Sequence, residues 1–344
     1  MAELTERQRL ILALIIREYI ETAQPVGSES LQKRYQLDAS PATIRNEMAV
    51  LTEAGYLRQP HTSAGRVPTE EGYRYFVRQL MGHIDLPADT KRTITHQFYQ
   101  IGYDPDRWMR LAASVLAQQA KAASLVTAPH VEQARFKHLE LISTRGRQVL
   151  MVLVLAGGDV RQQMLTLAEP VTQEQLSAAA NHLNQLLSGL GPEAIGALSP
   201  PLDALEADLV RLIVEELRHA GQLLGSEVYR DGLTHVLSQP EFSESESARK
   251  ALRILEERPL LEDLLTRTLE TTNVGGVQVL IGGEGTWEEL RDCSMVLARY
   301  GAPGLATGAL GVLGPIRMAY GRSISTVRFV AGLLSDLVVE LHSE

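Results

Sequence analysis

A helix start followed at once by a polar loop is the feature that most constrains the fold of this chain, and it occupies residues 40–75. Ser40 is a good N-cap, and Pro41 takes the first helical position, where its missing N–H costs nothing. Gly55 can end this helix. Three apolar residues recur at i, i+4 and i+7 and would form one core-facing stripe: Ile44, Met48 and Leu51. The opposite face should therefore point outward.

That outward face combines small residues with side chains that can pair with base edges or phosphate oxygens. They lie near the N-terminus of the helix: Ala42, Thr43, Arg45 and Asn46. Upstream, an apolar helix is expected over residues 5–22, with Thr5 and Gln8 in capping-box spacing. A second, short helix is expected from about Ser28 to Tyr35, and the tight connection LDAS leads from it into the helix at Pro41. This order predicts a helix-turn-helix, whose recognition helix needs such a mixture in its first turns.

The polar loop that follows has strand-like flanks around Tyr56–Leu57 and Val67, which suits a β-wing, and Pro68 and Thr69 start a further helix. The loop holds Pro60, His61, Thr62, Ser63, Gly65 and Arg66. Residues 1–80 are thus predicted to form a winged helix-turn-helix domain that binds double-stranded DNA. Its candidate contacts are Ser40, Ala42, Thr43, Arg45, Asn46, His61, Thr62, Ser63 and Arg66.

Charge does not settle this interpretation. Residues 1–80 hold ten Lys and Arg against ten Asp and Glu, so the net charge of −9 lies downstream. Phosphate attraction would rest on a local grouping, and two copies in a dimer would be needed: Arg45, Arg58, His61, Arg66, Arg74 and Arg78. Three alternatives remain. The pattern also occurs in globular proteins that bind no DNA, Arg45 could pair with Glu47 or Glu53 on a solvated face, and His61 could serve surface packing.

Six strings along the chain carry a resemblance: PVGSESL, SPATIRNEMAVL, EAGYLRQPHTSAGRVPTEEGYRYFV, QPEF at 239–242, DCSMVLARYG and LGVLGPIRMAYGR. In this order, and over nearly the full chain, they resemble the HrcA family of heat-inducible transcription repressors. The resemblance implies a homodimeric repressor that binds an inverted-repeat operator, the CIRCE element, upstream of chaperone operons. It also implies that the GroE chaperonin supports the repressor's activity.

Two positions depart from the family pattern. Thr52 stands where the family usually has an acidic residue, and IGGEG at 281–285 lacks the Asn expected at its last position. The first should barely affect specificity because it lies late in the recognition helix. The second could alter a turn in the effector region, or a pocket if one exists there.

Length and composition predict two or three domains, because 344 residues with 44% hydrophobic content can bury more than one core. The longest apolar run, at 149–156, is far below the roughly 18–20 residues of a membrane-spanning helix, and it is a strand candidate. No secretory signal is expected at the N-terminus. Cys293 is the one cysteine, which excludes an internal disulfide and fits the cytoplasm. It is interpreted as a buried apolar residue, with a redox sensor as the alternative.

Beyond residue 80 the pattern alternates between helix and strand. Helix is expected over 88–127, and an antiparallel meander of three apolar runs follows from Phe136. Helices are then expected at about 172–188 and 202–223, followed by a helical stretch from residue 244, three strands and a final helix.

The predicted fold class is α+β and multidomain. An N-terminal winged helix-turn-helix precedes a GAF-like α/β domain that an inserted dimerising α+β domain interrupts; the dimerising role comes from the family resemblance. The domains are placed at 1–80, at 88–155 with 226–344 (GAF-like effector), and at 156–225 (insertion), with edges good to about 15 residues.

No catalytic, metal or cofactor site is expected. Ser247 and Lys250 match S-x-x-K, but the companion motifs of penicillin-binding enzymes are missing. The Gly-rich stretches lack the Lys-Ser/Thr of a P-loop, and five histidines lack metal-ligand spacing: His96, His130, His138, His182 and His235. The favoured function is the dimeric repressor. The alternative is a small-molecule-gated winged-helix regulator that uses a GAF-like ligand pocket.

Overall fold

The computed structural model of the chain has a mixed α/β fold with several sheets. It describes residues 4–61, 64–82, 84–102, 104–130, 134–156, 160–198, 200–220, 227–242, 245–269 and 272–341. The chain forms two compact units. The first comprises Met1–Val126, Val228–Tyr300 and Ala309–Leu334, and the second comprises Thr127–Glu227, Gly301–Gly308 and Ser335–Glu344. Each unit is described by itself.

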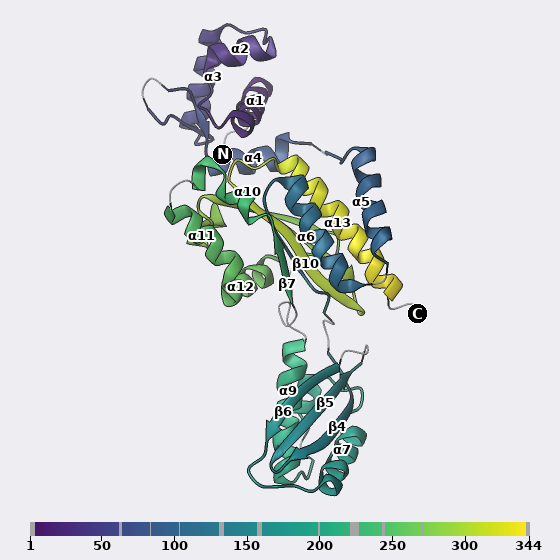
Figure 1. Cartoon of the computed structure of the whole chain (residues 1–344). Coiled ribbons are helices and arrows are strands. Elements are labelled where there is room, and N and C mark those ends of the chain that lie inside the picture. Colours follow the sequence, from purple (N-terminus) through teal and green to yellow (C-terminus); the bar gives the residue numbers. More distant parts are fainter. Residues whose placement is uncertain are drawn as a thin grey trace. The chain divides into compact units, whose positions relative to one another are not determined.

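The N-terminal segment of the first unit, residues 4–82, consists of three helices, a two-stranded antiparallel pair and a further helix (Figure 1). Its elements are α1 (Glu6–Thr22), α2 (Ser28–Tyr35), α3 (Pro41–Glu53), β1 (Leu57–Arg58), β2 (Val67–Pro68), α4 (Glu70–Tyr75) and the π-helical turn η1 (Phe76–Leu80). These bounds confirm the helices and strands predicted for this segment. The capping box of Thr5 and Gln8 is also confirmed, because each side chain accepts a hydrogen bond from the other's backbone N–H.

The strand pair is held to the helices by one short bridge. Val26 and Arg66 exchange two backbone hydrogen bonds, each of 2.9 Å, between the α1–α2 connection and the strand pair. Gly65 makes this approach possible, because a Cβ there would lie 2.4 Å from the carbonyl oxygen of Val26. The loop between β1 and β2 is therefore anchored at its base.

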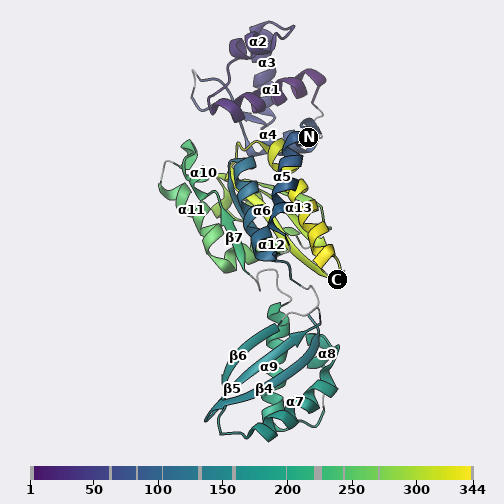
Figure 2. The same ribbon diagram turned by 45° about the vertical axis from the view of Figure 1, so that its right-hand side comes forward.

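The rest of the first unit is built on a five-stranded sheet of order β7-β3-β10-β9-β8. Its strands are β3 (Ala123–Thr127), β7 (Val228–Asp231), β8 (Val277–Ile281), β9 (Cys293–Ala302) and β10 (Ala306–Pro315). Its helices are α5 (Ala88–Ile101), α6 (Pro105–Ala120), α10 (Leu233–Leu237), α11 (Ser245–Glu256), α12 (Arg258–Leu269) and α13 (Tyr320–Leu341), whose residues from Ser335 on are counted with the second unit. Helices α6 and α13 run side by side (Figures 1 and 2), and Arg322 Nη2 donates to Gln119 Oε1 at 3.0 Å.

The structure corrects two details of the sequence interpretation in this unit. Residues 88–127 are not one helix, because Gly102 has a φ of +70° and Asp104 caps a new helix. The end of that stretch is strand β3, whose five residues are all buried and which pairs with β10 in the sheet. Strand β7 was not predicted, because four residues are too few to show a period.

The second unit contains an antiparallel sheet of order β4-β5-β6 (Figure 2). Its elements are β4 (Phe136–Arg145), β5 (Gln148–Leu155), β6 (Val160–Thr166), α7 (Gln173–Leu187), α8 (Pro192–Gly196) and α9 (Ala204–Ala220). The predicted meander and both long helices are confirmed. One hydrophobic core joins all three strands to α7 and α9. The predicted domain edge at residue 155 therefore lies within this sheet, between two strands paired over seven residues.

The two faces of the three-stranded sheet differ. Along β5, residues from Val149 to Leu155 alternate between buried and half-buried, so one set enters the core with the helices. Figure 2 shows α9 behind the sheet. The other face carries apolar side chains from all three strands, which are exposed or half-buried: Ile142, Leu150, Val152, Val154, Val160 and Met164. Such a face is unusual, because the open face of an antiparallel sheet is commonly polar.

No helix among the described residues is both long enough and apolar enough to cross a lipid bilayer.

Candidate nucleic-acid interface

The start of α3 is organised by its own hydroxyl groups. Ser40 Oγ accepts a hydrogen bond from the backbone N–H of Thr43 at 3.1 Å and lies 2.9 Å from Thr43 Oγ1. This confirms Ser40 as the N-cap, ahead of Pro41 at the first helical position. Ser40 and Ala42 are exposed, so the first turn of α3 presents small groups outward.

Helix α3 has one buried and one exposed face, as its apolar stripe predicted. Ile44, Met48 and Leu51 are buried, while Arg45 and Asn46 are exposed. Within the described residues, Arg45 makes no ion pair with Glu47 or Glu53. Arg45 therefore leaves its charge available to solvent or to a ligand.

Glu47 has other partners. Its Oε2 accepts from Gln8 Nε2 at 3.0 Å, and its Oε1 lies 3.8 Å from Arg7. Both partners lie at the start of α1, so the carboxylate of Glu47 joins α3 to α1. The alternative in which Glu47 neutralises Arg45 is not what the structure shows.

The predicted wing residues lie in different environments. His61 is exposed, and Thr62 and Ser63 fall outside the described residues. Arg66 is half-buried, and its Nε donates to Thr52 Oγ1 at 3.0 Å. Thr52 in turn donates to the Met48 carbonyl at 2.7 Å. The Arg66 side chain thus lies against the C-terminal half of α3 and ties the base of the loop to it.

Helix α4 is joined directly to the end of α3. Thr69 Oγ1 accepts from the N–H of Gly72 at 3.1 Å and donates to the Gly55 carbonyl at 2.6 Å. Gly55 has a φ of +83°, so it is the helix stop that the sequence indicated. The Thr69 hydroxyl therefore caps α4 and also binds the carbonyl of Gly55, the residue at which the chain leaves α3.

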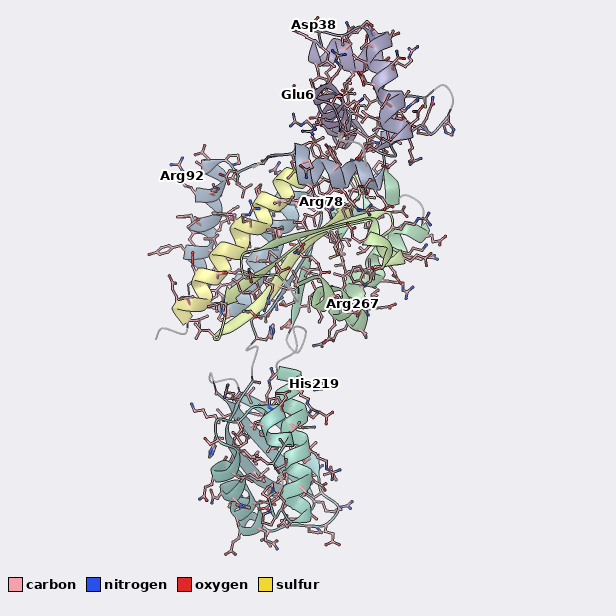
Figure 3. The ribbon with its side chains drawn as sticks, turned by 180° about the vertical axis from the view of Figure 1, so that it is seen from behind. Glu6, Asp38, Arg78, Arg92, His219 and Arg267 are labelled. Carbon is pink, nitrogen blue, oxygen red and sulfur yellow. The ribbon has the colours of Figure 1, made fainter. Side chains whose placement is uncertain are left out.

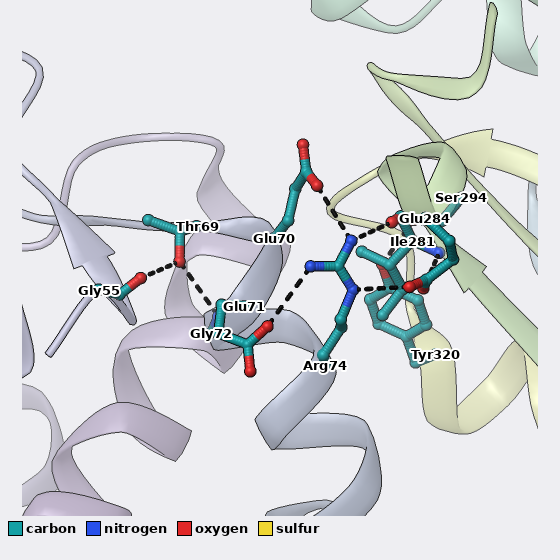
Figure 4. A network of polar contacts seen from close by, with 10 residues as sticks. All are labelled: Gly55, Thr69, Glu70, Glu71, Gly72, Arg74, Ile281, Glu284, Ser294 and Tyr320. Carbon is teal, nitrogen blue, oxygen red and sulfur yellow. Dashed lines mark hydrogen bonds and ion pairs between the residues drawn. The ribbon is translucent and has the colours of Figure 1, made fainter. Parts of the chain in front are cut away.

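The structure corrects the assignment of Arg74 to phosphate attraction. Its guanidinium lies 3.0 Å from both Glu70 and Glu284 and 3.4 Å from Glu71, and its Nη2 donates to the Ile281 carbonyl at 2.8 Å (Figure 4). Burial lowers the pKa of Arg74, but Glu284 and Glu70 outweigh that effect and raise it. Three carboxylates surround this cation, so it does not serve as a free phosphate contact.

By contrast, Arg78 in η1 is exposed (Figure 3), so its charge faces solvent.

Other reactive groups have ordinary structural roles. Burial raises the pKa of the Cys293 thiol to about 12, which keeps it protonated, in line with its interpretation as a buried apolar residue. Lys250 of the S-x-x-K match lies 3.2 Å from Glu246 on the same helix. Among the described residues, no group of three His, Cys, Asp or Glu could hold a metal ion.

Described residues of the first unit line two cavities of interest. One of about 800 Å³ is lined by Tyr19, Gly55, Arg58, Pro68, Thr69, Glu70, Glu71, Arg74, Arg291, Asp292, Ile316 and Arg317. The other, of about 430 Å³, has a more apolar lining that includes Tyr35, Phe76, Met81 and Ile84. Both are bordered by the N-terminal segment, and the charged residues that line the first are of both signs.

Comparison with known proteins assigns the family. The model of the HrcA protein C-terminal domain matches residues 106–324. The chain belongs to the HrcA family. Proteins named heat-inducible transcription repressor HrcA are 48% identical in Roseiflexus castenholzii, 42% in Thermomicrobium roseum and 36% in Dehalococcoides mccartyi. The alignments cover 99%, 98% and 99% of this chain and 96%, 97% and 98% of the relatives.

A solved structure shares the fold. A crystal structure of a hypothetical protein is similar with a TM-score of 0.62 and 23% sequence identity, over 98% of this chain and 100% of that one. Membership of the HrcA family places the chain among heat-inducible transcription repressors. The resemblance that the sequence strings carry is thereby confirmed.

Sequence reasoning missed several contacts of the N-terminal segment. The hydrogen bonds from Arg66 to Thr52, from Thr69 to Gly55 and from Arg74 to Glu284 span 14, 14 and 210 residues. One of these residues, Thr52, was noted in the sequence as a departure from the family pattern. The other departure lies at position 285, next to Glu284, which accepts from Arg74.

Proposed function

We propose that this protein is a homodimeric, heat-inducible transcriptional repressor that binds a CIRCE-type inverted-repeat operator. The observation that carries the proposal is the outer face at the start of α3, where Arg45 and Asn46 are exposed beside the small residues of a capped first turn. The relatives named heat-inducible transcription repressor HrcA support the same function. The protein would act in the cytoplasm, where its operator lies, and needs no cofactor for this role.

In this proposal the N-terminal segment is a winged helix-turn-helix. Helix α3 enters the major groove, and Arg45 and Asn46 contact base edges while Ser40, Ala42 and Thr43 allow close approach. The loop between β1 and β2 is the wing, and His61, Thr62, Ser63 and Arg66 follow the sugar-phosphate backbone or the minor groove. Because residues 1–80 carry no net positive charge, specificity depends on these few contacts and on two copies that bind together.

Dimerisation is assigned to the second unit. Its three-stranded sheet exposes Ile142, Val160 and Met164 by 42%, 48% and 53% on the face away from its helices. By register His138, Glu140 and Gln162 share this face, so the apolar residues form a stripe between polar ones, and an exposed apolar stripe suits an interaction surface. A second copy related by a two-fold axis would cover it and would present two α3 helices to two inverted half-sites.

This surface gives a direct test of the dimer. Met164→Asp would place a charge in the apolar face and shift the protein to monomers in sedimentation equilibrium. Gln163→Asp is the matched control, because Gln163 is the exposed neighbour whose register places it on the other side of the sheet. Dimers that persist in Met164→Asp would exclude this face.

The domain bounds proposed here follow the observed helices and strands. The winged helix-turn-helix keeps residues 1–80, and the inserted dimerising domain extends from about residue 134 to about 220, since β4 and β5 share a core with α7 and α9. The five-stranded sheet and its helices form the effector domain, for which a GAF-like fold is proposed. Modulation by the GroE chaperonin belongs to this proposal through the family resemblance, and its contact surface is not assigned.

The alternative, a small-molecule-gated regulator, is favoured only by the cavity of about 430 Å³ with its partly apolar lining. The two functions differ in what releases the DNA. A metabolite that shifts operator affinity tenfold, about 1.4 kcal/mol of coupling, would favour the alternative.

The test is binding of the purified protein to a CIRCE-type inverted repeat and to a scrambled duplex of the same composition. Both are titrated over salt, with and without GroE chaperonin. Strong preference for the repeat, increased by chaperonin, is the expected result. Equal, weak binding to both duplexes would contradict the proposal.

A further inference from the structure

We infer that Arg74 is a positioning residue that connects the 281–284 segment to helix α3 through α4, and so holds the DNA-binding helices in the orientation that engages two half-sites at once. The inference rests on the proposed function. It assigns a role to a cation that does not itself contact DNA.

Arg74 lies where two segments far apart in sequence meet. Its Nη2 donates to Glu70 at 3.0 Å within α4, while its Nε donates to Glu284 at 3.0 Å in the turn after β8 (Figure 4). The same Nη2 also donates to the Ile281 carbonyl at 2.8 Å, so the contact involves the backbone of the 281–284 segment as well as its carboxylate. The side chain of Arg74 is only 18% exposed, and partly buried charge-assisted hydrogen bonds are among the stronger polar contacts.

The 281–284 segment is shaped for this contact. Gly282 has a φ of +65°, which favours glycine, and it lies so near Glu70 that a Cβ there would be 2.4 Å from the carboxyl carbon of that flexible side chain. Glu284 adopts a φ of +49°, which is unfavourable for a residue with a side chain. Its carboxylate accepts from Arg74 and, at 3.1 Å, from the N–H of Ile281. These two hydrogen bonds offset the unfavourable backbone conformation.

On the other side, hydrogen bonds and close packing hold α4 against the end of α3. The Thr69 hydroxyl donates to the Gly55 carbonyl at 2.6 Å, and the Thr69 N–H donates to the Tyr56 carbonyl at 3.1 Å. A Cβ on Gly72 would lie 2.2 Å from that same Tyr56 oxygen, which shows how closely α4 packs on the end of the α3 region. A change in the position of α4 must therefore be passed to α3.

An apolar contact beside Arg74 keeps α4 attached but does not constrain its orientation in the same way. The rings of Tyr73 and Tyr320 lie 5.9 Å apart, and the Tyr320 hydroxyl lies 2.7 Å from Ser294 Oγ and donates to the Ile316 carbonyl at 2.5 Å. The polar side of α4 instead borders the cavity of about 800 Å³. Arg74 thus supplies directional, charge-assisted contacts at the edge of an open, polar space, beside the buried Tyr73.

The consequence for DNA binding follows from effective concentration. Once one α3 helix of the dimer occupies a half-site, binding of the second α3 helix is an intramolecular event. The probability of that event depends on how narrowly the position of the second helix is restricted. A loosened α4 lowers this probability, while the chemistry between each α3 and its own half-site is unchanged. Loss of the Arg74 contact should therefore weaken binding to the complete repeat and leave a single half-site unaffected.

The experiment is a double-mutant cycle with Arg74→Gln, Glu284→Gln and the combination. Each single variant should bind the CIRCE-type inverted repeat about tenfold more weakly, within the usual range of coupling effects, and the double variant should lose no more than either single one. Binding to a duplex with one half-site should stay within about twofold of the parent protein. Arg267→Gln is the matched control, because Arg267 on α12 (Figure 3) pairs with Asp263 at 2.7 Å on the surface of the same unit.

A second measurement does not depend on DNA. Amide hydrogen exchange in Glu284→Gln should be faster at Gly72 and Thr69 than in the parent protein or in Arg267→Gln. Unchanged exchange at these amides would overturn the connection from the 281–284 segment to α4. An equal loss of affinity for the half-site and the complete repeat would overturn the positioning role. Failure of the parent protein to prefer the repeat over a scrambled duplex would instead contradict the proposed function.

Discussion

Two arginines of the N-terminal segment, 29 positions apart, show how differently the same side chain can be used. Arg45 lies on the outer face of α3, exposed and, among the described residues, without an ion pair to Glu47 or Glu53. Arg74 lies on α4 with carboxylates of Glu70, Glu71 and Glu284 around it. The comparison teaches that the number of cations in a segment does not predict its attraction for phosphate. What matters is which of them lack an anionic partner after folding.

The largest expected effect concerns the buried face that allows α3 to display Arg45. Leu51 is fully buried, so Leu51→Ala should lower the free energy of unfolding by about 2–5 kcal/mol through lost burial and a residual cavity. Urea unfolding followed by circular dichroism measures this. Val50→Ala is the control, because Val50 is 44% exposed on the same helix and should change stability by less than about 0.5 kcal/mol. Equal losses would show that the two faces of α3 are wrongly assigned.

Arg45→Ala tests the exposed member of the comparison. Operator binding should weaken by about 1–3 kcal/mol, with relaxed specificity at one position per half-site, because a base contact is removed. Stability should change by less than about 0.5 kcal/mol, since the side chain is exposed. Titration against operators substituted at each position separates the outcomes. A uniform loss over all sequences would make Arg45 a phosphate contact instead.

Ser40→Ala tests how the outer face is presented. The hydroxyl of Ser40 caps the N–H of Thr43, so its removal should destabilise the protein by about 1 kcal/mol. Thermal unfolding measures the effect. Ser40→Asp is the informative companion, because aspartate also caps a helix but adds a negative charge close to the proposed phosphates. It should therefore restore stability and still weaken DNA binding. If both variants bind DNA as the parent does, the first turn of α3 lies away from the DNA.

The smallest expected effect separates His61 from Arg66 at the loop between β1 and β2. Arg66→Ala should reduce the slope of log affinity against log salt by about 1, because one phosphate contact is lost. His61→Ala is the companion variant, and a slope change as large as that of Arg66→Ala would assign a phosphate contact to His61 as well. An unchanged slope in Arg66→Ala would mean that Arg66 does not contact phosphate. Its role would then be structural, because its hydrogen bond to Thr52 Oγ1 ties the base of the loop to α3.

Local sequence signals predicted the elements of the N-terminal segment well. Ser40, Pro41 and Gly55 act over one or two turns of backbone, and the structure confirms the N-cap, the first helical position and the positive φ that they indicated. The meander from Phe136 was predictable for a similar reason, because each run alternates or is apolar over a few residues. Strand β3 was missed because its residues, at 123–127, continue the apolar composition of α6, and their extended conformation depends on pairing with β10.

The candidate site was predictable in outline and less so in its contacts. The exposed and buried faces of α3 follow from a period of 3.6 residues, which the sequence contains. The apolar outer face of the three-stranded sheet was not recognised, since a run such as 149–156 reads as a buried strand until its register assigns alternate residues to opposite faces.

The sequence by itself determined the family, the order of helices and strands in the N-terminal segment and the residues that α3 presents outward. These follow from motifs and from interactions between near neighbours, whose geometry the backbone constrains. Only the tertiary structure decided the distant partners of these cations. Arg74 gains Glu284, 210 residues away, in addition to Glu70 and Glu71 on its own helix, and Arg66 donates to Thr52 Oγ1, 14 residues away. Charge is additive along a chain, but electrostatic interaction depends on distance in space, and folding alone sets that distance.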